Sequence, residues 1–412
     1  MSPTRESRFL LLLTALNLLD YLDRYLIAAL GSLVKAELGL SDRAFGFLGT
    51  AFFLVYLLTS PLFGWLGDRL GRVRLMAAGA VLWSLATSLT FWVTSYPALL
   101  LTRGLVGVGE ASYGTLAPAL IADRLPLHRR SSALGFFYLA IPVGSALAYL
   151  AGGLIGSHWG WRTAFLLGGL PGLFLAWMLV RHASAAPAPP AVPPAVPPRV
   201  ELPWTAAREL WRRPTFRLVT LGYGMTTFAL GGLAFWMPRF LEVVKGLSLA
   251  QANYLLFGAV TLAGGLGTVT GGYLGGRLLS LTPRAPLWVS GLGVALAVPL
   301  AALVIFSPNP RVYVPCLVGA VFLLFLNPGV LTSIIVSIAG PARRAQAVAL
   351  NIIIIHLVGD VPSPFLIGWV SDLGNLTMGV SLTLVALTLG AVLLLSALPW
   401  YQRDLEQAET PG

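Results

Sequence analysis

Long apolar runs separated by short polar segments make up most of this chain. Runs of about 20 residues are long enough to cross a bilayer as helices, and these lack the ten-residue alternation of a membrane barrel strand. The pattern predicts an all-α polytopic membrane protein with twelve transmembrane helices. They cover about residues 9–34, 44–66, 74–94, 97–122, 131–156, 163–181, 216–240, 251–278, 286–306, 312–338, 344–370 and 377–399.

A proline-rich stretch divides the twelve runs into two sets of six. Its repeated Pro-Pro pairs cannot continue a helix and favour extended polyproline II, which suits a tether. The segment 204–216 after it has the pattern of an amphipathic helix at the membrane surface. We therefore predict an N-terminal six-helix bundle, a cytoplasmic linker, a C-terminal six-helix bundle and a cytoplasmic tail, covering 1–182, 183–215, 216–400 and 401–412.

The composition agrees with a membrane protein. Of 412 residues, 57% are hydrophobic and 10% are charged, and the mean hydropathy is +0.80, whereas a soluble protein carries charge on about a quarter of its residues. The single cysteine, Cys316, lies in an apolar run, which excludes a disulfide framework and a cysteine metal site. The first apolar run is too long for a signal peptide, so we expect a retained first helix.

The net charge of +11 is explained by topology and not by nucleic-acid binding. Nineteen of the 27 basic residues fall in loops on one side of the predicted helices, six on the other, and Arg24 and Arg103 lie within the membrane. Because basic loops stay in the cytoplasm, we place both termini there, in a multi-pass protein of the cell (inner or plasma) membrane.

Three charges interrupt the first apolar run, at Asp20, Asp23 and Arg24. A charge at the bilayer centre costs roughly 2.5–3.5 kcal/mol on the insertion scale, so such residues face partners or a cavity. Asp20 and Arg24 are four residues apart, which favours a pair along the helix. Asp23 points about 100° away from Arg24, and we expect it to meet Arg103 or Glu110 of the fourth helix.

The fourth helix carries "RGLVGVGEASYG", residues 103–114. Arg103 and Glu110 are seven apart and share one face, and glycines at 104, 107 and 109 are expected to let a neighbouring helix approach closely. One interpretation is a functional polar site. The alternative is a salt bridge between helices 1 and 4 that only holds the bundle together.

"HLVGDVPSP", residues 356–364, places His356 and Asp360 on one face of the eleventh helix. Pro362 and Pro364 break the helix beyond them and free backbone carbonyls. The pair is either a proton carrier or a hydrogen-bonded interior pair, and the spacing favours neither.

The segment after the second helix, "GWLGDRLGR" (64–72), resembles the loop motif of the major facilitator superfamily. In that family the acid and arginines latch the two halves on the cytoplasmic side, which here implies a gate of Asp68, Arg69 and Arg72. The alternative is a basic membrane anchor with an incidental acid. "GGYLGGR" (271–277) follows the eighth helix as a degenerate second copy without the acid.

Over nearly its whole length the chain resembles the spinster branch of that superfamily. The resemblance rests on the motifs above and on four quoted stretches: "NLLDYLDRY", "RGLVGVGEASYGTLAPALIAD", "FYLAIPVGSALAYLAG" and "HLVGDVPSPFLIGWVSD". It implies the major facilitator fold and movement of lysophospholipids or sphingosine-1-phosphate, proton-linked or facilitated. It also implies that Asp23, Arg24, Arg103 and Glu110 line a central cavity. Asp20 replaces the asparagine usual in the family, which leaves open the carboxylate that takes the proton.

The predicted function is therefore a proton-coupled secondary transporter of amphipathic anionic lipids that works by alternating access. Arg24 and Arg103 are the expected phosphate ligands, Tyr21, Tyr113, Phe228 and Trp236 complete the substrate site, and the proton-responsive residues are Asp20, Asp23, Glu110, His356 and Asp360. Two alternatives remain, an exporter of drugs or small organic anions and a lipid sensor with little transport. Without a nucleophile elbow, a Walker loop or a His/Cys cluster we expect no enzyme, cofactor or metal. We expect a monomer whose partners are its lipid substrate, protons and membrane lipids.

Overall fold

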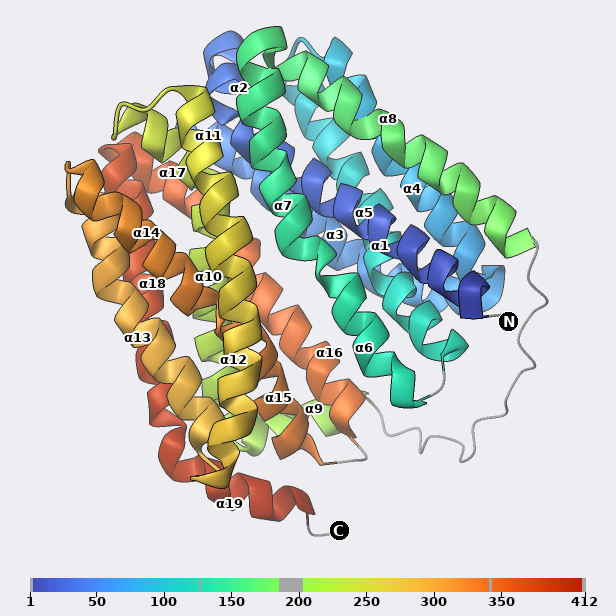
Figure 1. Cartoon of the computed structure of the whole chain (residues 1–412), viewed down its shortest axis with the longest axis vertical. Coiled ribbons are helices and arrows are strands. Elements are labelled where there is room, and N and C mark those ends of the chain that lie inside the picture. Colours follow the sequence, from blue (N-terminus) through green and yellow to red (C-terminus); the bar gives the residue numbers. More distant parts are fainter. Residues whose placement is uncertain (1–2, 126, 185–202, 341–342, 410–412) are drawn as a thin grey trace. The chain divides into compact units, whose positions relative to one another are not determined.

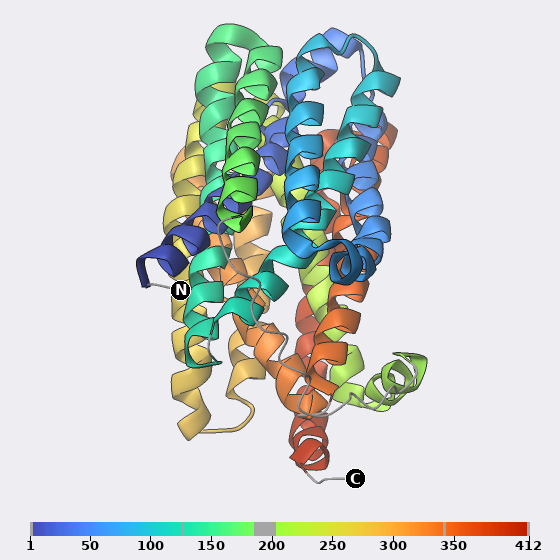
Figure 2. The same cartoon turned by 90° about the vertical axis from the view of Figure 1, so that its right-hand side faces the viewer.

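The computed structural model describes residues 3–125, 127–184, 203–340 and 343–409. Within these ranges the regular structure consists of helices, with no β-strand. Figures 1 and 2 show that the long helices of each compact part lie side by side. The all-α prediction is confirmed. Most of the predicted linker, residues 185–202, lies outside the described residues.

The contacts divide the chain into two compact units. The first unit is Met1–Val192 with Ala234–Gly258, and the second is Pro193–Leu233 with Ala259–Gly412. The sequence predicts two halves that divide at the linker. The contacts differ in one respect, because they assign the segment 234–258, which lies in the predicted C-terminal half, to the first unit.

The first unit begins with the elements that carry the charged motifs. Its elements are α1 (Pro3–Ala29), α2 (Gly31–Leu38), α3 (Asp42–Leu70), α4 (Arg72–Leu89), η1 (Thr90–Trp92), α5 (Tyr96–Arg124), α6 (Leu127–Tyr138), α7 (Ala140–Ala151), η2 (Gly152–Gly156) and α8 (Ser157–Ser184). It also contains the end of α10 (Pro214–Val243) and all of α11 (Leu249–Gly258).

The second unit contains the remaining elements and the start of α10. They are α9 (Pro203–Arg212), η3 (Ala259–Gly264), α12 (Gly265–Arg277), η4 (Leu278–Ser280), α13 (Ala285–Phe306), α14 (Pro310–Phe325), α15 (Asn327–Ala339), α16 (Arg344–Ile355), η6 (His356–Asp360), α17 (Ser363–Leu373), α18 (Leu376–Ser396) and α19 (Leu398–Glu409). The segment predicted as an amphipathic helix thus forms α9, and most of the predicted tail belongs to α19.

Ten described segments are long and apolar enough to cross a membrane. One of them, Ala133–Arg181, contains two predicted spans, which are separated where Gly160 adopts φ +79° and ψ 165° inside α8. A side chain at that backbone conformation would be strained, so glycine permits the turn between the two spans. α1 is not among the ten because Asp20, Asp23 and Arg24 interrupt its apolar run.

Several predicted spans are interrupted helices. The first divides into α1 and α2 at Leu30, and the fifth and eleventh contain the π-helical turns η2 and η6. A π-helical turn inserts one residue and is frequent at functional sites. In the eleventh span this turn is formed by the motif residues His356–Asp360 themselves.

Glycines set the distance between the helices that surround the charged motifs. A Cβ atom on Gly109 of α5 would lie 2.6 Å from the carbonyl oxygen of Gly79 on α4, and one on Gly107 would lie 2.8 Å from that of Phe52 on α3. At Gly104 the nearest atom, in Val55, is 4.0 Å away. Close approach is therefore confirmed at two of the three predicted glycines, and the prediction for Gly104 is wrong because that residue meets a side chain at ordinary contact distance.

The hydrogen bonds of Glu37, near the end of α2, give a prediction about the pH dependence of stability. The Glu37 carboxylate accepts hydrogen bonds from the Arg162 guanidinium and, at 2.7 Å, from the Trp161 indole. These hydrogen bonds, the one from Arg162 first, lower the pKa of Glu37 below its ordinary value of 4.5. The stabilisation is therefore complete above pH 4.5 and is lost as the pH falls through the lower pKa of the folded protein.

We accordingly expect Glu37→Gln to lower the melting temperature of the purified protein slightly at pH 7. The expected loss is below about 1 kcal/mol because the pair is partly exposed. Melting curves from pH 7 to pH 3 should show the two proteins converging as the acid takes up its proton. A difference that grows toward low pH would contradict this account.

Candidate functional site

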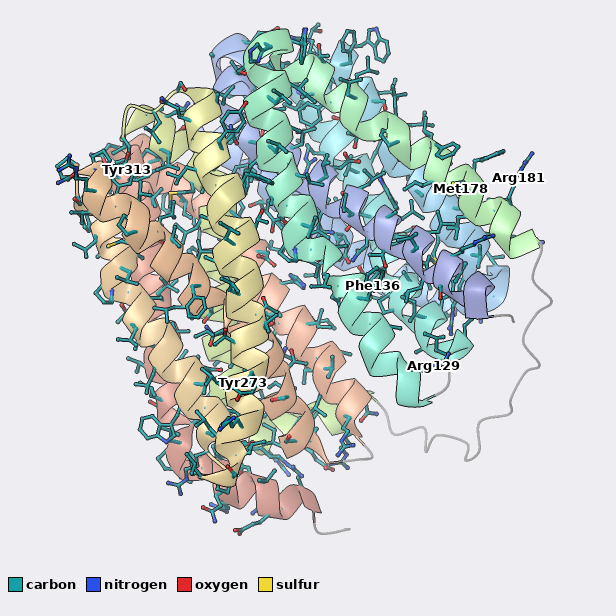
Figure 3. The ribbon with its side chains drawn as sticks, viewed as in Figure 1. Arg129, Phe136, Met178, Arg181, Tyr273 and Tyr313 are labelled. Carbon is teal, nitrogen blue, oxygen red and sulfur yellow. The ribbon has the colours of Figure 1, made fainter. Side chains whose placement is uncertain are left out.

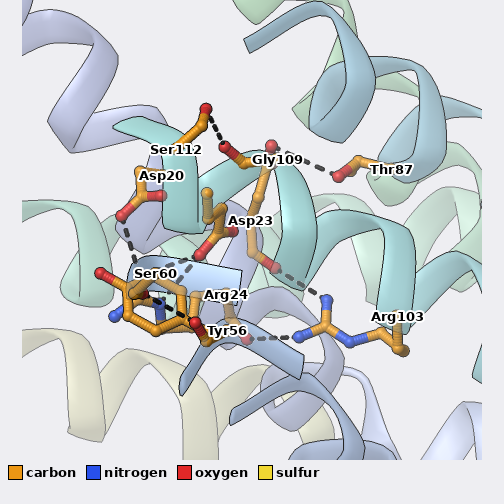
Figure 4. Close-up of polar contacts among 10 residues, drawn as sticks. Asp20, Asp23, Arg24, Tyr56, Ser60, Thr87, Arg103, Gly109 and Ser112 are labelled. Carbon is orange, nitrogen blue, oxygen red and sulfur yellow. Dashed lines mark hydrogen bonds and ion pairs between the residues drawn. The ribbon is translucent and has the colours of Figure 1, made fainter. Parts of the chain in front are cut away.

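Arg24 lies at the centre of a buried polar cluster formed by α1 and α5. Its Nη2 atom is 3.0 Å from Asp20 Oδ2 and 2.9 Å from Glu110 Oε2, and its Nε atom donates to the same Glu110 oxygen at 3.0 Å. Asp20 and Glu110 are buried, with 1% and 0% of their surface exposed. The predicted Asp20–Arg24 pair is confirmed, and Figure 4 shows its surroundings. A single guanidinium therefore serves two carboxylates.

Aromatic rings surround this guanidinium. Its central carbon lies 4.4 Å from the ring centroid of Tyr21, 5.2 Å from that of Phe52 and 5.3 Å from that of Tyr56. Phe52 also lies 5.0 Å below the guanidinium of Arg103. Ring faces attract cations more strongly where water is excluded, so these rings help to keep two arginines charged in an apolar environment.

Arg103 contacts the backbone of α1. Its Nη1 atom is 3.5 Å from the carbonyl oxygen of Asp23 and its Nη2 atom is 3.4 Å from that of Arg24. Only 2% of its surface is exposed. Among the described side chains it forms no ion pair with a carboxylate, and its two hydrogen bonds are long ones that a stronger acceptor could replace.

Asp23 lies on another side of α1 from Arg24. Its Oδ2 atom accepts a hydrogen bond of 3.4 Å from the Thr87 hydroxyl of α4, and its Oδ1 atom faces Gly168 of α8. The expected meeting with Glu110 or with the Arg103 side chain does not occur, because only the backbone carbonyl of Asp23 reaches Arg103. Its carboxyl group is thus the one acid of this cluster without an ion pair.

The cluster has more acids than bases. It contains three acids, Asp20, Asp23 and Glu110, and two bases, Arg24 and Arg103, so full ionisation leaves one excess negative charge. Uncompensated charge is strongly unfavourable in an apolar interior. The cluster is therefore suited to bind one proton, and a second proton would make it cationic.

The residues predicted to complete the substrate site lie in different surroundings. Tyr21 faces Arg24, but the Tyr113 hydroxyl donates to the backbone carbonyl of Leu13 and the side chain is fully buried. Trp236 packs edge-on against Phe45 in the first unit, with ring centroids 5.5 Å apart. Phe228 belongs to the second unit and is 8% exposed. The contacts of Tyr113 and Trp236 are those of packing residues.

The predicted His356–Asp360 pair forms in the second unit. His356 Nδ1 lies 2.6 Å from Asp360 Oδ2 across the turn η6. The π-helical turn brings this pair against α10, where Asp360 faces Gly231 at a distance that leaves no room for a Cβ atom. About 30% of the His356 side chain is exposed, against 11% for Asp360, so the imidazole is the accessible end of the pair.

The three residues predicted as a cytoplasmic gate have separate environments. Arg72 forms an ion pair with Asp123 of α5, and the Arg69 guanidinium stacks on Trp65 at 3.9 Å. The Asp68 backbone belongs to α3, but its side chain lies outside the described part. Asp123 is therefore a partner of Arg72 that the sequence motif did not include.

Sequence reasoning also missed three residues around the buried cluster. Phe52 and Tyr56 are four residues apart on α3, so their shared face could have been noticed, although nothing in the sequence indicates that it meets arginines. Nothing in the sequence singles out Thr87, because a single threonine in an apolar helix more often forms a hydrogen bond with the backbone of its own helix.

The comparisons with known proteins identify the family of this chain. Residues 13–364 match the family model of the major facilitator superfamily. Protein spinster homolog 1 of Homo sapiens is 35% identical over 402 residues, which cover 90% of this chain and 74% of the human protein. The sphingosine-1-phosphate transporter SPNS2 of Mus musculus is 32% identical, with 87% and 68% covered.

A solved structure agrees at the level of the fold. The crystal structure of a bacterial homolog of the human lysosomal transporter spinster, inward-facing and unoccupied, matches with a TM-score of 0.87 and 24% identity over the full length of both chains. Proteins of this kind are transporters and not enzymes. The chain therefore belongs to the major facilitator superfamily and, within it, to the spinster family of membrane transporters.

Proposed function

We propose that this transporter moves lysophospholipids or sphingosine-1-phosphate-like lipids by alternating access and that protons drive the movement. The observation that carries the proposal is the position of Arg24 between Asp20 and Glu110. Guanidinium groups bind phosphate with two parallel hydrogen bonds. The same donors of Arg24 now serve carboxylates, so phosphate and carboxylates compete for them.

Protonation decides this competition. When Glu110 takes up a proton its attraction for Arg24 falls, and the Nε atom becomes available to an anionic headgroup. The Nη2 atom also binds Asp20 and becomes available when that acid takes up the second proton of the cluster. Fully ionised, the cluster has one excess negative charge and repels phosphate, whereas two bound protons leave it with one positive charge. Arg103, whose hydrogen bonds go to two carbonyl oxygens, supplies the second phosphate ligand. Proton and lipid are thereby expected to bind together.

The remaining predicted residues have supporting places in this proposal. Asp23, Asp20 and the His356–Asp360 pair are further proton-responsive groups. Tyr21, Tyr113, Phe228 and Trp236 complete the substrate site, Tyr21 beside Arg24 and the buried Tyr113 and Trp236 as packing residues that support its walls. Asp68, Arg69 and Arg72 form the cytoplasmic gate. The protein acts as a monomer in the cell membrane with both termini in the cytoplasm, in agreement with the nineteen basic residues on one side.

The test is uptake of labelled lysophospholipid and sphingosine-1-phosphate into proteoliposomes, with and without an imposed pH gradient. The gradient should accelerate uptake by the unchanged protein severalfold. Glu110→Gln and Asp23→Asn should remove this acceleration, while Glu37→Gln, the same chemical change outside the buried cluster, should retain it.

Each contrary result has a defined meaning. Gradient-dependent uptake that survives in both cluster variants would contradict the coupling. Uptake of small organic anions without uptake of either lipid would favour the exporter. Binding of lipid without accumulation over time would favour a lipid sensor.

A further inference from the structure

Three membrane helices end in the same local arrangement of an aromatic ring followed four residues later by an arginine. The guanidinium carbon lies 3.9 Å from the ring centroid in Trp65–Arg69 of α3, 4.2 Å in Trp177–Arg181 of α8 and 5.6 Å in Tyr273–Arg277 of α12. Residues four apart are neighbours on a helix surface. We name these three the aromatic–arginine pairs.

The aromatic–arginine pairs lie on the outside of their units. Trp65, Trp177 and Tyr273 are 52%, 49% and 57% exposed, and the arginines are exposed as well. Figure 3 labels Arg181 and Tyr273 and shows their side chains on the outer surface of their helices. Each ring lies at the end of an apolar span. Tryptophan and tyrosine are enriched at this position, which corresponds to the membrane–water interface.

The internal sequence repeat shows that an aromatic–arginine pair can occur without the acid of the gate motif. "GWLGDRL" (64–70) and "GYLGGRL" (272–278) align without a gap. The two copies share the aromatic residue, the arginine and a buried glycine: Gly67 packs against Leu116 of α5, and Gly275 against Val330 of α15. The acid Asp68 has no counterpart, since Gly276 takes its position. The aromatic–arginine pair is thus present in the copy that lacks the acid.

The arginines of the pairs have unused hydrogen-bonding capacity. Arg69, Arg181 and Arg277 form no ion pair with any carboxylate whose side chain is described, and within the described residues Arg277 donates to the Tyr273 hydroxyl alone. The ring beneath the guanidinium of Arg69 and Arg181 fixes its plane, and the hydrogen bond to the Tyr273 hydroxyl holds Arg277 beside its ring. Both arrangements leave guanidinium donors for a bidentate acceptor. An anionic headgroup is the acceptor available at the end of a membrane span.

We propose that the three aromatic–arginine pairs bind the phosphate groups of anionic phospholipids in the adjacent leaflet. The ring contacts the lipid chain near the headgroup, and the guanidinium held beside the ring binds the phosphate. These sites lie on the outer surface of the helices and concern the surrounding bilayer, so they do not depend on which lipid the protein transports.

The experiment is a lipid titration of the purified full-length protein by native mass spectrometry, with phosphatidylglycerol and, separately, phosphatidylcholine. The unchanged protein should bind up to three phosphatidylglycerol molecules more tightly than phosphatidylcholine. A basic residue near an anionic headgroup contributes about 1 kcal/mol, so Arg69→Gln and Arg277→Gln should each weaken one site about fivefold. Trp65→Leu and Tyr273→Leu retain the charge and should weaken the same sites about two- to fivefold.

Arg74→Gln is the matched control, because Arg74 is exposed in the first turn of α4 and stacks on no ring among the described side chains. It should leave the tight sites unchanged. The proposal is overturned if Arg69→Gln and Arg277→Gln bind phosphatidylglycerol like the unchanged protein. It is equally overturned if Arg74→Gln causes the same loss, or if phosphatidylcholine binds as tightly. Equal melting temperatures of all variants in detergent exclude misfolding as the cause of a loss.

Discussion

Replacing Arg24 by methionine is expected to cost about 3–5 kcal/mol of stability, because removing one partner of a buried ion pair leaves an uncompensated charge. Here two acids are affected at once, since Asp20 and Glu110 both bind this guanidinium. Methionine fills similar space without a charge. The loss should appear as a lower melting temperature at pH 7 and should shrink at low pH, where the acids bind protons.

A double-mutant cycle isolates the Arg24–Glu110 contact. In Arg24→Met/Glu110→Gln no charge of this pair remains, so the double variant should be more stable than the sum of the single losses predicts. Arg311→Met, at an exposed arginine of α14, controls for loss of positive charge and should change stability by less than about 0.5 kcal/mol. Additive losses in the cycle would mean that the two groups do not interact.

Arg24→Met should also lower lipid affinity if phosphate binds where the carboxylates now bind. Hydrogen bonds to charged groups contribute about 1.5–3 kcal/mol, which corresponds to a roughly 10- to 100-fold weaker apparent affinity. Arg24→Lys keeps the charge but loses the bidentate geometry, so its lipid affinity should lie between those of the unchanged protein and Arg24→Met. Unchanged lipid affinity in Arg24→Met would show that Arg24 does not bind the substrate. It would not affect the stability prediction.

A methyl group on Gly109 is expected to destabilise the first unit by about 3 kcal/mol, the upper end of the range for overpacked cores. The added Cβ atom would lie 2.6 Å from the Gly79 carbonyl oxygen and 2.7 Å from the Trp83 amide nitrogen. Backbone atoms cannot rotate away as a side chain can, so α4 and α5 must separate. Since α5 also carries Glu110, Gly109→Ala should reduce transport together with stability.

The matched control for Gly109→Ala lies on the same helix. A Cβ atom at Gly104 meets only Val55, at 4.0 Å, and alanine favours a helix over glycine by about 0.5–1 kcal/mol. Gly104→Ala should therefore leave the melting temperature unchanged or raise it. Equal destabilisation by both substitutions would show that helix flexibility, and not the distance between α4 and α5, is the quantity that these glycines control.

Part of the buried cluster could be predicted from the sequence because it depends on one helix alone. Asp20 and Arg24 are four residues apart, as are His356 and Asp360, and both pairs form as expected. A spacing of seven residues placed Arg103 and Glu110 on one face of α5, but it could not show that Glu110 would bind Arg24 while Arg103 would reach two carbonyl oxygens.

Contacts between helices depended on the tertiary structure. Asp23 faces Thr87 instead of an arginine, Arg72 pairs with Asp123, and Gly104 lacks the close neighbour that Gly107 and Gly109 have. Each of these outcomes is set by the rotation of one helix about its axis relative to the next. That rotation results from the packing of many side chains, so no short motif contains it.

The sequence by itself determined the all-helical membrane architecture, the apolar spans and the pairs within single helices. These follow from hydrophobicity and from the 3.6-residue period, both of which are local properties of the chain. The tertiary structure decided which acid serves which arginine, which rings surround them and which acid lacks a basic partner. Those contacts join residues far apart in the chain, and only the packed helices bring them within hydrogen-bonding distance.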